Sequence, residues 1–232
     1  AQEEMLTAFD LEKCPKSDLS DELQSVMGQV VNTALYVKSM SLSGIDTDLL
    51  PMGKLAHETI TKAEGFLKQI SAFIKEKTEI AEDLTKAGAI EKLWGVENKI
   101  YELSSRFYEI IPHKNFVNTP IPPIDNEREL ETKLSMIKNL GDFELVSRML
   151  LGAHNKKKEV NPMDYVLSAL NVKLEALDKE SEEFRTLMEY IKNTSNETIE
   201  KSIKNIFVLQ RRGEAENFQK WKKLANKKLL FH

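Results

Sequence analysis

The spacing of apolar residues changes once along this chain, and that change limits the folds the chain can adopt. As far as residue 152, apolar residues recur every three or four positions, which is the period of amphipathic helices. Farther on they alternate with polar residues, as in a half-buried strand, at Leu170, Val172, Leu174 and Ala176. The polar segment NKKKE at residues 155–159 separates the two patterns. An all-helical front followed by mixed strands and helices predicts two domains.

The front part is expected to form four amphipathic stretches with recognisable ends. Ser17 or Ser20 can cap the first helix, and Pro112 stops the third. Asn126 with Glu129 three residues later is a capping-box-like start for the fourth, which Gly152 is expected to end. The apolar faces are Leu23, Val26, Val30 and Ala34; Ile60, Ala63, Leu67, Ile70 and Ile74; Leu93, Val96, Ile100, Leu103, Phe107 and Ile110; and Leu130, Leu134, Ile137 and Leu140.

The back part reads as the beginning of an α+β domain. A helix is expected around Phe184, Leu187 and Ile191, and a short one around Phe218, Trp221 and Ala225. Strands are expected at Ile203, Ile206 and Val208, and at residues 229–232, where the chain ends as if cut short. The predicted fold class is mainly α: an orthogonal or up-down helical bundle, then an incomplete α+β segment. The predicted divisions are a linker at 1–17, a helical domain at 18–154 and the second domain at 155–232.

Composition narrows the possible functions. The formal net charge of −4 argues against nonspecific nucleic-acid binding by the whole chain, since that footprint is usually basic. No apolar run is long enough to span a membrane, so no membrane partner is expected. Cys14 is the only cysteine, which excludes an internal disulfide and fits a cytosolic or nuclear setting. His57, His113 and His154 lack metal-like spacing, so we expect no metal site, and His113 is interpreted as a helix-end residue that satisfies carbonyls.

Two groups of charged residues could be interpreted as functional sites, but a solvated surface explains both groups better. Asp142 and Glu144 are two residues apart on a helix and do not face each other, so we interpret them as a solvated face. Lysines cluster near the end, at Lys220, Lys222, Lys223, Lys227 and Lys228. Without stacking aromatics beyond Trp221, a solvated face is favoured there over a nucleic-acid site.

Five segments, in order, resemble one family. They are LPMGKL at residues 50–55, SSRFYEIIPH at 104–113, LGDFE at 140–144, NPMDY at 161–165 and NKKLLFH at 226–232. Together they resemble the regulatory domain of poly(ADP-ribose) polymerases and the entry to their transferase domain. The resemblance favours the DNA-dependent members, because mono-transferase and ankyrin-linked relatives are expected to lack the helical domain.

The resemblance implies a chemistry that this chain holds only in part. The family transfers ADP-ribose from NAD to protein side chains, using a histidine, a tyrosine and a glutamate. His232 would be the histidine, which helps to hold the ribose of NAD, and the other two would lie beyond the chain. We therefore expect NAD as a substrate of the parent enzyme, no metal, and no activity from this fragment alone.

The resemblance also implies regulation. The helical domain would cover the NAD site and keep it closed until a DNA break, bound by other domains of a nuclear repair protein, loosens it. Ile137, Leu140 and Asp142 are the expected autoinhibitory contacts. Partners would be the remaining transferase domain and a possible accessory factor that completes the active site. The alternatives are a helical interaction module without ADP-ribosylation chemistry, and a nucleic-acid binder that uses the C-terminal lysines.

Overall fold

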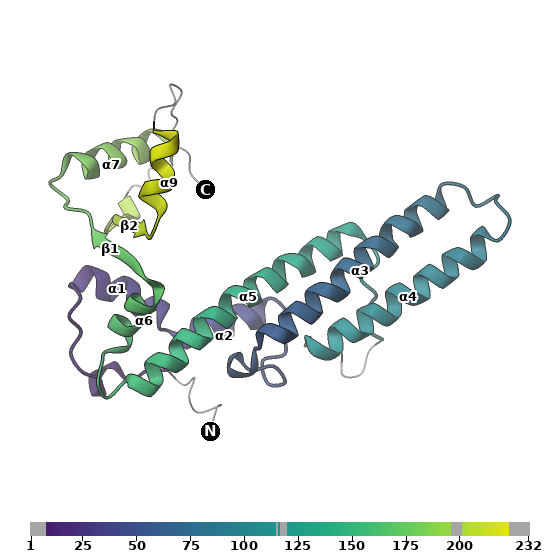
Figure 1. The fold of residues 1–232 in the computed structure, drawn as a ribbon, viewed down its shortest axis with the longest axis horizontal. Helices are drawn as coiled ribbons and strands as arrows, with labels where there is room; N and C mark the ends of the chain where they lie inside the picture. The colour runs from purple at the N-terminus through teal and green to yellow at the C-terminus, as the bar shows by residue number, and fades with distance from the viewer. Residues whose placement is uncertain (1–7, 115, 117–119, 196–200, 223–232) are drawn as a thin grey trace. The chain divides into compact units, whose positions relative to one another are not determined.

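The computed structural model describes residues 8–114, 116, 120–195 and 201–222. The chain divides into two compact units: Ala1–Phe9 with Asn32–Asn155, and Asp10–Val31 with Lys156–His232. The described elements are η2 (Leu11–Lys13), α1 (Asp21–Val30), α2 (Thr33–Leu42), η3 (Met52–Lys54), α3 (His57–Ala81), α4 (Ala89–Ile110), α5 (Glu127–Lys156), α6 (Pro162–Leu170), β1 (Val172–Ala176), α7 (Glu182–Thr194), β2 (Phe207–Arg211) and α9 (Glu214–Trp221). The predicted class, mainly helical with a small α+β segment, is confirmed (Figure 1).

Helices α3 and α4 form a closely packed antiparallel hairpin in the first unit. All five apolar residues predicted for the face of α3 are buried, from Ile60 to Ile74. The turn between the helices ends at Gly88, whose φ of 74° lies in the left-handed region that glycine adopts without steric cost. Across the hairpin, Lys77 pairs with Glu97 at 3.2 Å and the ammonium of Lys99 lies 5.1 Å from the centroid of the Phe73 ring.

Helix α5 begins where the sequence predicted and ends later. The Asn126 side chain accepts a hydrogen bond from the backbone N–H of Glu129 at 3.0 Å, which confirms the predicted cap. The helix then continues through Gly141 and Gly152 to Lys156, so the predicted end at Gly152 is wrong. A glycine costs a helix only about 1 kcal/mol relative to alanine. The fully buried Leu150 and Ala153, on either side of Gly152, stabilise the continued helix by tertiary packing.

The first predicted apolar stripe is shared between two helices rather than one. Helix α1 ends at Val30, and Asn32 caps α2 by accepting a hydrogen bond from the N–H of Ala34 at 3.1 Å. Ser20 caps α1 by accepting from the N–H of Leu23, as one of the two predicted alternatives. Val30 and Ala34 have the spacing of neighbours on one helix face only by chance, because the helix is interrupted at Asn32. The two helices belong to different compact units.

The second unit pairs α1 with α6 beside a two-stranded sheet. Strands β1 and β2 are antiparallel, with Val172 opposite Arg211 and Ala176 opposite Phe207. Helix α6 was not predicted, and Leu170, which was assigned to a strand, is its last residue. Asn161 fixes the start of α6 by accepting from the N–H of Met163 at 2.9 Å, and its amide donates to the carbonyl of Pro15 at 2.8 Å. The expected last strand, at residues 229–232, lies outside the described residues.

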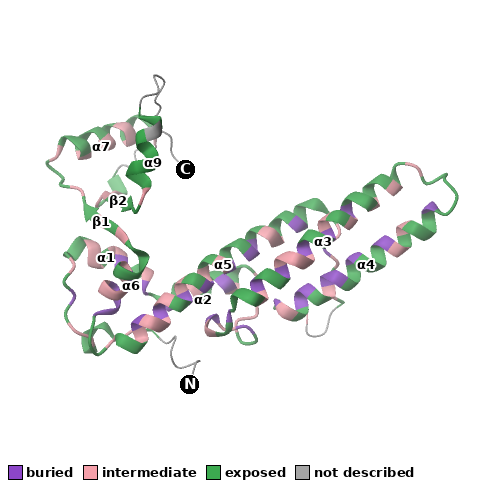
Figure 2. Cartoon of the chain, in the orientation of Figure 1, coloured by how far each residue is buried: buried purple, intermediate pink, exposed green. Residues whose placement is uncertain are grey.

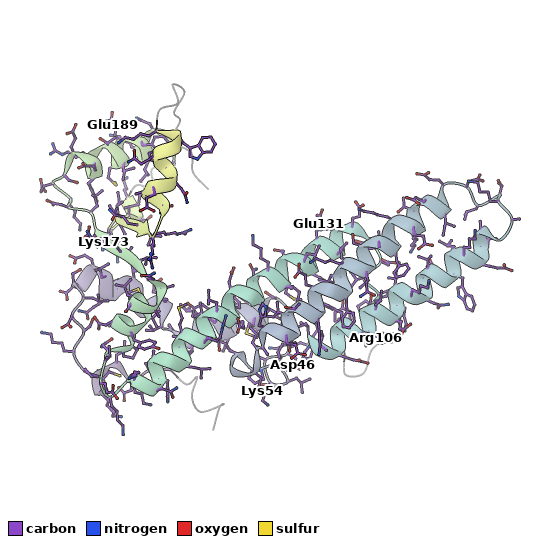
Figure 3. All side chains as sticks on the ribbon, in the orientation of Figure 1. Asp46, Lys54, Arg106, Glu131, Lys173 and Glu189 are labelled. Atoms are coloured by element: carbon purple, nitrogen blue, oxygen red, sulfur yellow. The ribbon has the colours of Figure 1, made fainter. Side chains whose placement is uncertain are left out.

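The buried residues of the first unit follow the inward faces of its long helices (Figure 2). Fully buried side chains come from all three of them, including Leu67 of α3, Phe107 of α4 and Leu140 of α5. Charged side chains such as Arg106 and Glu131 project outward (Figure 3). Among the described residues, no helix has the length and apolar character needed to cross a membrane.

A buried serine fastens the proline-rich connector to α4. The hydroxyl of Ser104 donates to the carbonyl of Ile100 at 2.7 Å and accepts from the N–H of Ile124 at 2.9 Å. Both Ser104 and Ile124 are fully buried, so water does not replace this bond. The Ser104 hydroxyl therefore ties the connector to α4 shortly before α5 begins.

Replacing Ser104 with alanine is expected to lower the free energy of unfolding by roughly 1–3 kcal/mol, because it leaves the buried N–H of Ile124 unsatisfied. The matched control is Ser105→Ala, since the Ser105 hydroxyl only donates to the carbonyl of Tyr101 one turn back, nearer the solvent. Urea denaturation followed by circular dichroism measures both. Equal losses in the two variants would contradict the fastening role of Ser104.

Candidate functional site

The three residues predicted as autoinhibitory contacts lie on α5, but they do not share one surface. Ile137 and Leu140 are 3% and 1% exposed and form part of the core, whereas Asp142 is exposed to solvent. Ile137 and Leu140 can therefore influence a neighbouring domain only through the stability and position of α5. Asp142 is free to make a direct contact. His232, the predicted NAD-binding residue, lies outside the described residues.

Helix α5 carries polar groups on its buried side. Glu144 is buried, and its carboxylate pairs with the Nε of Arg148 at 2.8 Å. Ser147 is also buried and donates to the carbonyl of Met52 at 3.3 Å. The interpretation of Glu144 as part of a solvated face is therefore wrong, because its position on the helix turns it inward while Asp142 remains outside. Burying these two polar side chains makes the packing of this half of α5 less favourable in free energy than the packing of an all-apolar helix face.

A buried polar pair joins the end of α4 to α5. The Nδ1 of His113 lies 2.7 Å from the carbonyl oxygen of Ile111, and its Nε2 lies 2.8 Å from the Nζ of Lys133. Nδ1 therefore carries the proton and donates to the carbonyl, while Nε2 accepts from the ammonium. This confirms His113 as a helix-end residue and adds a second contact, to a residue 20 positions away, that the sequence did not indicate.

The surroundings of His113 keep its ring neutral. Burial, and then the charge of the Lys133 ammonium, lower the pKa of His113 from 6.5 to about 4. Burial also lowers the pKa of Lys133, against the attraction of Glu129. Aromatic rings enclose the pair: Tyr108 meets His113 edge-on at 4.8 Å between centroids, and Phe116 stacks on it at 5.6 Å. The pair is a structural contact between the end of α4 and α5.

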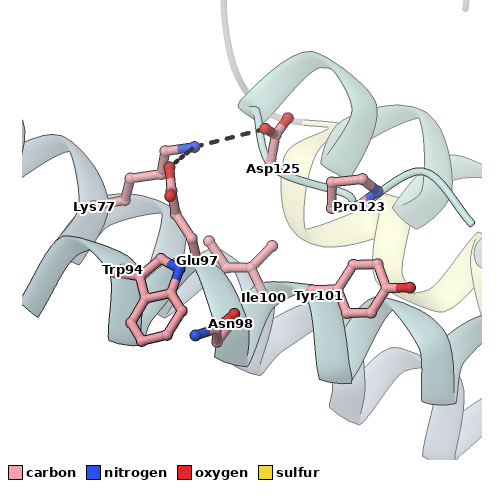
Figure 4. Close-up of a pocket in the computed structure, with 8 residues that line it drawn as sticks. All are labelled: Lys77, Trp94, Glu97, Asn98, Ile100, Tyr101, Pro123 and Asp125. Atoms are coloured by element: carbon pink, nitrogen blue, oxygen red, sulfur yellow. Dashed lines mark ion pairs between the residues drawn. The ribbon is translucent and has the colours of Figure 1, made fainter. Parts of the chain in front are cut away.

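A pocket of about 280 Å³ opens between α3, α4 and the segment before α5 (Figure 4). Lys77 lies between two carboxylates, 3.2 Å from Glu97 and 3.6 Å from Asp125. The remaining lining is Trp94, Asn98, Ile100, Tyr101 and Pro123. The four α4 residues Trp94, Glu97, Asn98 and Tyr101 have the i, i+3, i+4, i+7 spacing of one helix face, which the sequence already contained. The contribution of Lys77 and Asp125 could not be read from the sequence.

The pocket is a candidate for binding rather than catalysis. Its two carboxylates are both ion-paired to Lys77 and are not directed at each other. Among the described residues, no three histidine, cysteine, aspartate or glutamate side chains converge as a metal site requires.

Comparison with known protein families divides the chain into two consecutive parts. A model described as the poly(ADP-ribose) polymerase regulatory domain matches residues 17–166, and one for the poly(ADP-ribose) polymerase catalytic domain matches residues 181–232. The chain belongs to the poly(ADP-ribose) polymerase family. In this family member the first match runs from just before α1 to α6, and the second begins at Ser181, which caps α7. The predicted boundary between residues 154 and 155 lies inside the first match.

Curated relatives cover nearly the whole chain. It is 33% identical over 220 residues to a poly(ADP-ribose) polymerase of Sarcophaga peregrina and 27% identical over 233 residues to poly(ADP-ribose) polymerase 1 of Gallus gallus, covering 94% and 99% of this chain. These alignments span only 20% and 21% of the relatives' own lengths, so the chain corresponds to about a fifth of each.

One relative corrects an expectation. The protein mono-ADP-ribosyltransferase PARP3 of Mus musculus is 27% identical over 218 residues, covering 92% of this chain and 38% of the relative. The prediction that mono-transferases lack the helical domain is therefore wrong for this one. The helical region identifies the family but does not separate polymer-forming from mono-transferase members.

Proposed function

We propose that this chain is the regulatory region, with the first part of the transferase domain, of an enzyme that transfers ADP-ribose from NAD to proteins in response to DNA breaks. The observation that carries the proposal is the pair of consecutive family matches, regulatory over residues 17–166 and catalytic over residues 181–232. The names of the relatives, poly(ADP-ribose) polymerase and mono-ADP-ribosyltransferase, support the reaction class.

The regulatory step we propose is the loosening of the first compact unit, which uncovers the NAD site. Helix α5 is suited to this because its packed side combines the apolar Ile137 and Leu140 with the buried polar Glu144 and Ser147. Gly141, in the middle of the helix, touches no other side chain where a Cβ would be and lowers helix propensity. A unit of marginal stability can be switched by a few kcal/mol of differential contact.

The partners in this proposal follow from the same assignment. The remaining transferase domain would be covered by the helical unit, with Asp142 as its direct contact. DNA breaks would be bound by other domains of the parent, in the nucleus, and an accessory factor could complete the active site. Substitutions that loosen α5 test the proposal, because basal NAD turnover of the parent should rise without DNA.

The 232-residue chain itself is expected to be inactive. His232 would hold the ribose of NAD, while the tyrosine that stacks on nicotinamide and the glutamate that stabilises the oxocarbenium-like charge lie elsewhere in the parent. Catalysis needs several positioned groups around the developing charge. Incubation with labelled NAD should leave no label on protein above that of a His232→Ala control. Label above that control would show that the chain holds a complete active site.

A further inference from the structure

We propose that the pocket between α3, α4 and the start of α5 binds an arginine side chain presented by a peptide segment of a partner protein. The pocket lies within the first compact unit and includes none of the residues assigned to NAD or to the regulatory contact. The proposal therefore does not depend on the proposed enzymatic activity. It rests on the shape, the aromatic walls and the charge of the pocket.

The walls are aromatic side chains that the fold leaves exposed. Trp94 is 69% exposed and Tyr101 is 50% exposed, seven residues apart on one face of α4. Ile100 forms a buried floor between them, and the ring of Pro123 closes one side (Figure 4). Exposed aromatic rings that gather beside an apolar floor are typical of binding surfaces, whereas apolar residues scattered singly over a surface are not.

The charge of the pocket selects a cation. Glu97 and Asp125 contribute two carboxylates and Lys77 one ammonium, so one negative charge is left over. The carboxylates remain 45% and 42% exposed and keep lone pairs for another donor, whereas Lys77 is mostly covered. Two carboxylates repel phosphate groups, so the site is ill suited to a nucleotide or a nucleic acid.

Arginine fits this combination better than lysine. Its guanidinium is planar, weakly hydrated and carries five N–H donors, so it can stack on an indole or phenol ring while donating to a carboxylate. A lysine ammonium can lie over a ring, as Lys99 does over Phe73, but it is compact and strongly hydrated and has no planar face to stack. The volume of about 280 Å³ leaves room for one long side chain.

The experiment uses the full 232-residue chain with Trp221→Phe, so that Trp94 is its only tryptophan. Random 12-residue peptides on phage are selected against this chain and counter-selected against the same chain with Trp94→Ala. We expect the enriched peptides to share an arginine. A synthetic copy should then change Trp94 fluorescence saturably, and replacing its arginine with citrulline, the neutral isostere, should weaken binding by about tenfold or more.

Variants of the pocket locate the binding. Glu97→Gln and Asp125→Asn are each expected to weaken the arginine peptide by about three- to tenfold. Glu102→Gln is the matched control, because Glu102 lies on α4 outside the pocket and pairs with Arg106. Thermal unfolding checks that every variant is folded. The proposal is overturned if no peptide enrichment depends on Trp94, or if arginine-free peptides are enriched. It is also overturned if the citrulline peptide binds as tightly as the arginine peptide, or if Glu97→Gln and Asp125→Asn bind the arginine peptide as tightly as Glu102→Gln does.

Discussion

Replacing Leu140 with alanine is expected to lower the free energy of unfolding of the first unit by about 2–5 kcal/mol. Leu140 is 1% exposed, so the substitution removes buried methyl groups and leaves a cavity that the surrounding helices fill only in part. The matched control is Leu145→Ala. Leu145 lies on the same helix but is 50% exposed, so its substitution should lower the free energy of unfolding by no more than about 1 kcal/mol. Urea denaturation followed by circular dichroism measures the difference.

The same substitution tests the regulatory role when it is made in the parent enzyme. If loosening α5 uncovers the NAD site, Leu140→Ala and Ile137→Ala should raise NAD turnover without DNA by at least about tenfold, since each 1.4 kcal/mol changes an equilibrium tenfold. Activity with DNA should change little, and Leu145→Ala should leave basal activity near that of the unsubstituted parent. Unchanged basal activity in both core variants, with their stability lowered as expected, would rule out the helical unit as a gate.

Mild acid is expected to destabilise the first unit through His113. Its pKa is lowered to about 4 in the folded chain against 6.5 as a free side chain, so below pH 6.5 the unfolded state binds a proton that the folded state does not. Stability therefore falls as the pH drops through this range and levels off near pH 4. A shift of this size corresponds to roughly 2 kcal/mol lost between pH 7 and pH 5.

The groups around the ring keep this effect specific. The Lys133 ammonium repels a second positive charge on the His113 ring, and Tyr108 does not titrate in that range because burial raises its pKa to about 12. His113→Gln should remove the slope of stability against pH, whatever it does to stability at pH 7. His57→Gln, at an exposed position where α3 begins, should keep that slope. A slope that persists in His113→Gln would show that other groups cause it.

The local features of this chain were open to prediction because they depend on near neighbours in sequence. A helix face follows from apolar residues three and four positions apart, so the buried face of α3 was predicted in full. The caps at Ser20 and Asn126 follow from side chains that bond to the backbone three residues on. The family followed from five ordered segments, and its matches cover nearly all of the chain.

Errors arose where a local signal competed with a more distant contact. Gly152 was taken as the end of a helix, but packing around Leu150 and Ala153 outweighs the propensity of one glycine. At Asn32 a local bond decided instead. Its capping hydrogen bond starts a new helix within an apolar stripe that periodicity alone predicted to be one continuous helix. In each case the local signal was worth only about 1 kcal/mol, which is too small for a pattern to resolve.

What the sequence determined by itself is the long helices α3, α4 and α5, much of their buried faces and the family. What only the tertiary structure decided is which polar groups meet: His113 with Lys133, Ser104 with Ile124, and Lys77 with Asp125. The physical reason is that periodicity states which side of a helix is buried but not which residue of another helix lies opposite. That partner is fixed only when the helices pack, and it determines the charge of the pocket, the protonation of His113 and the burial of Glu144.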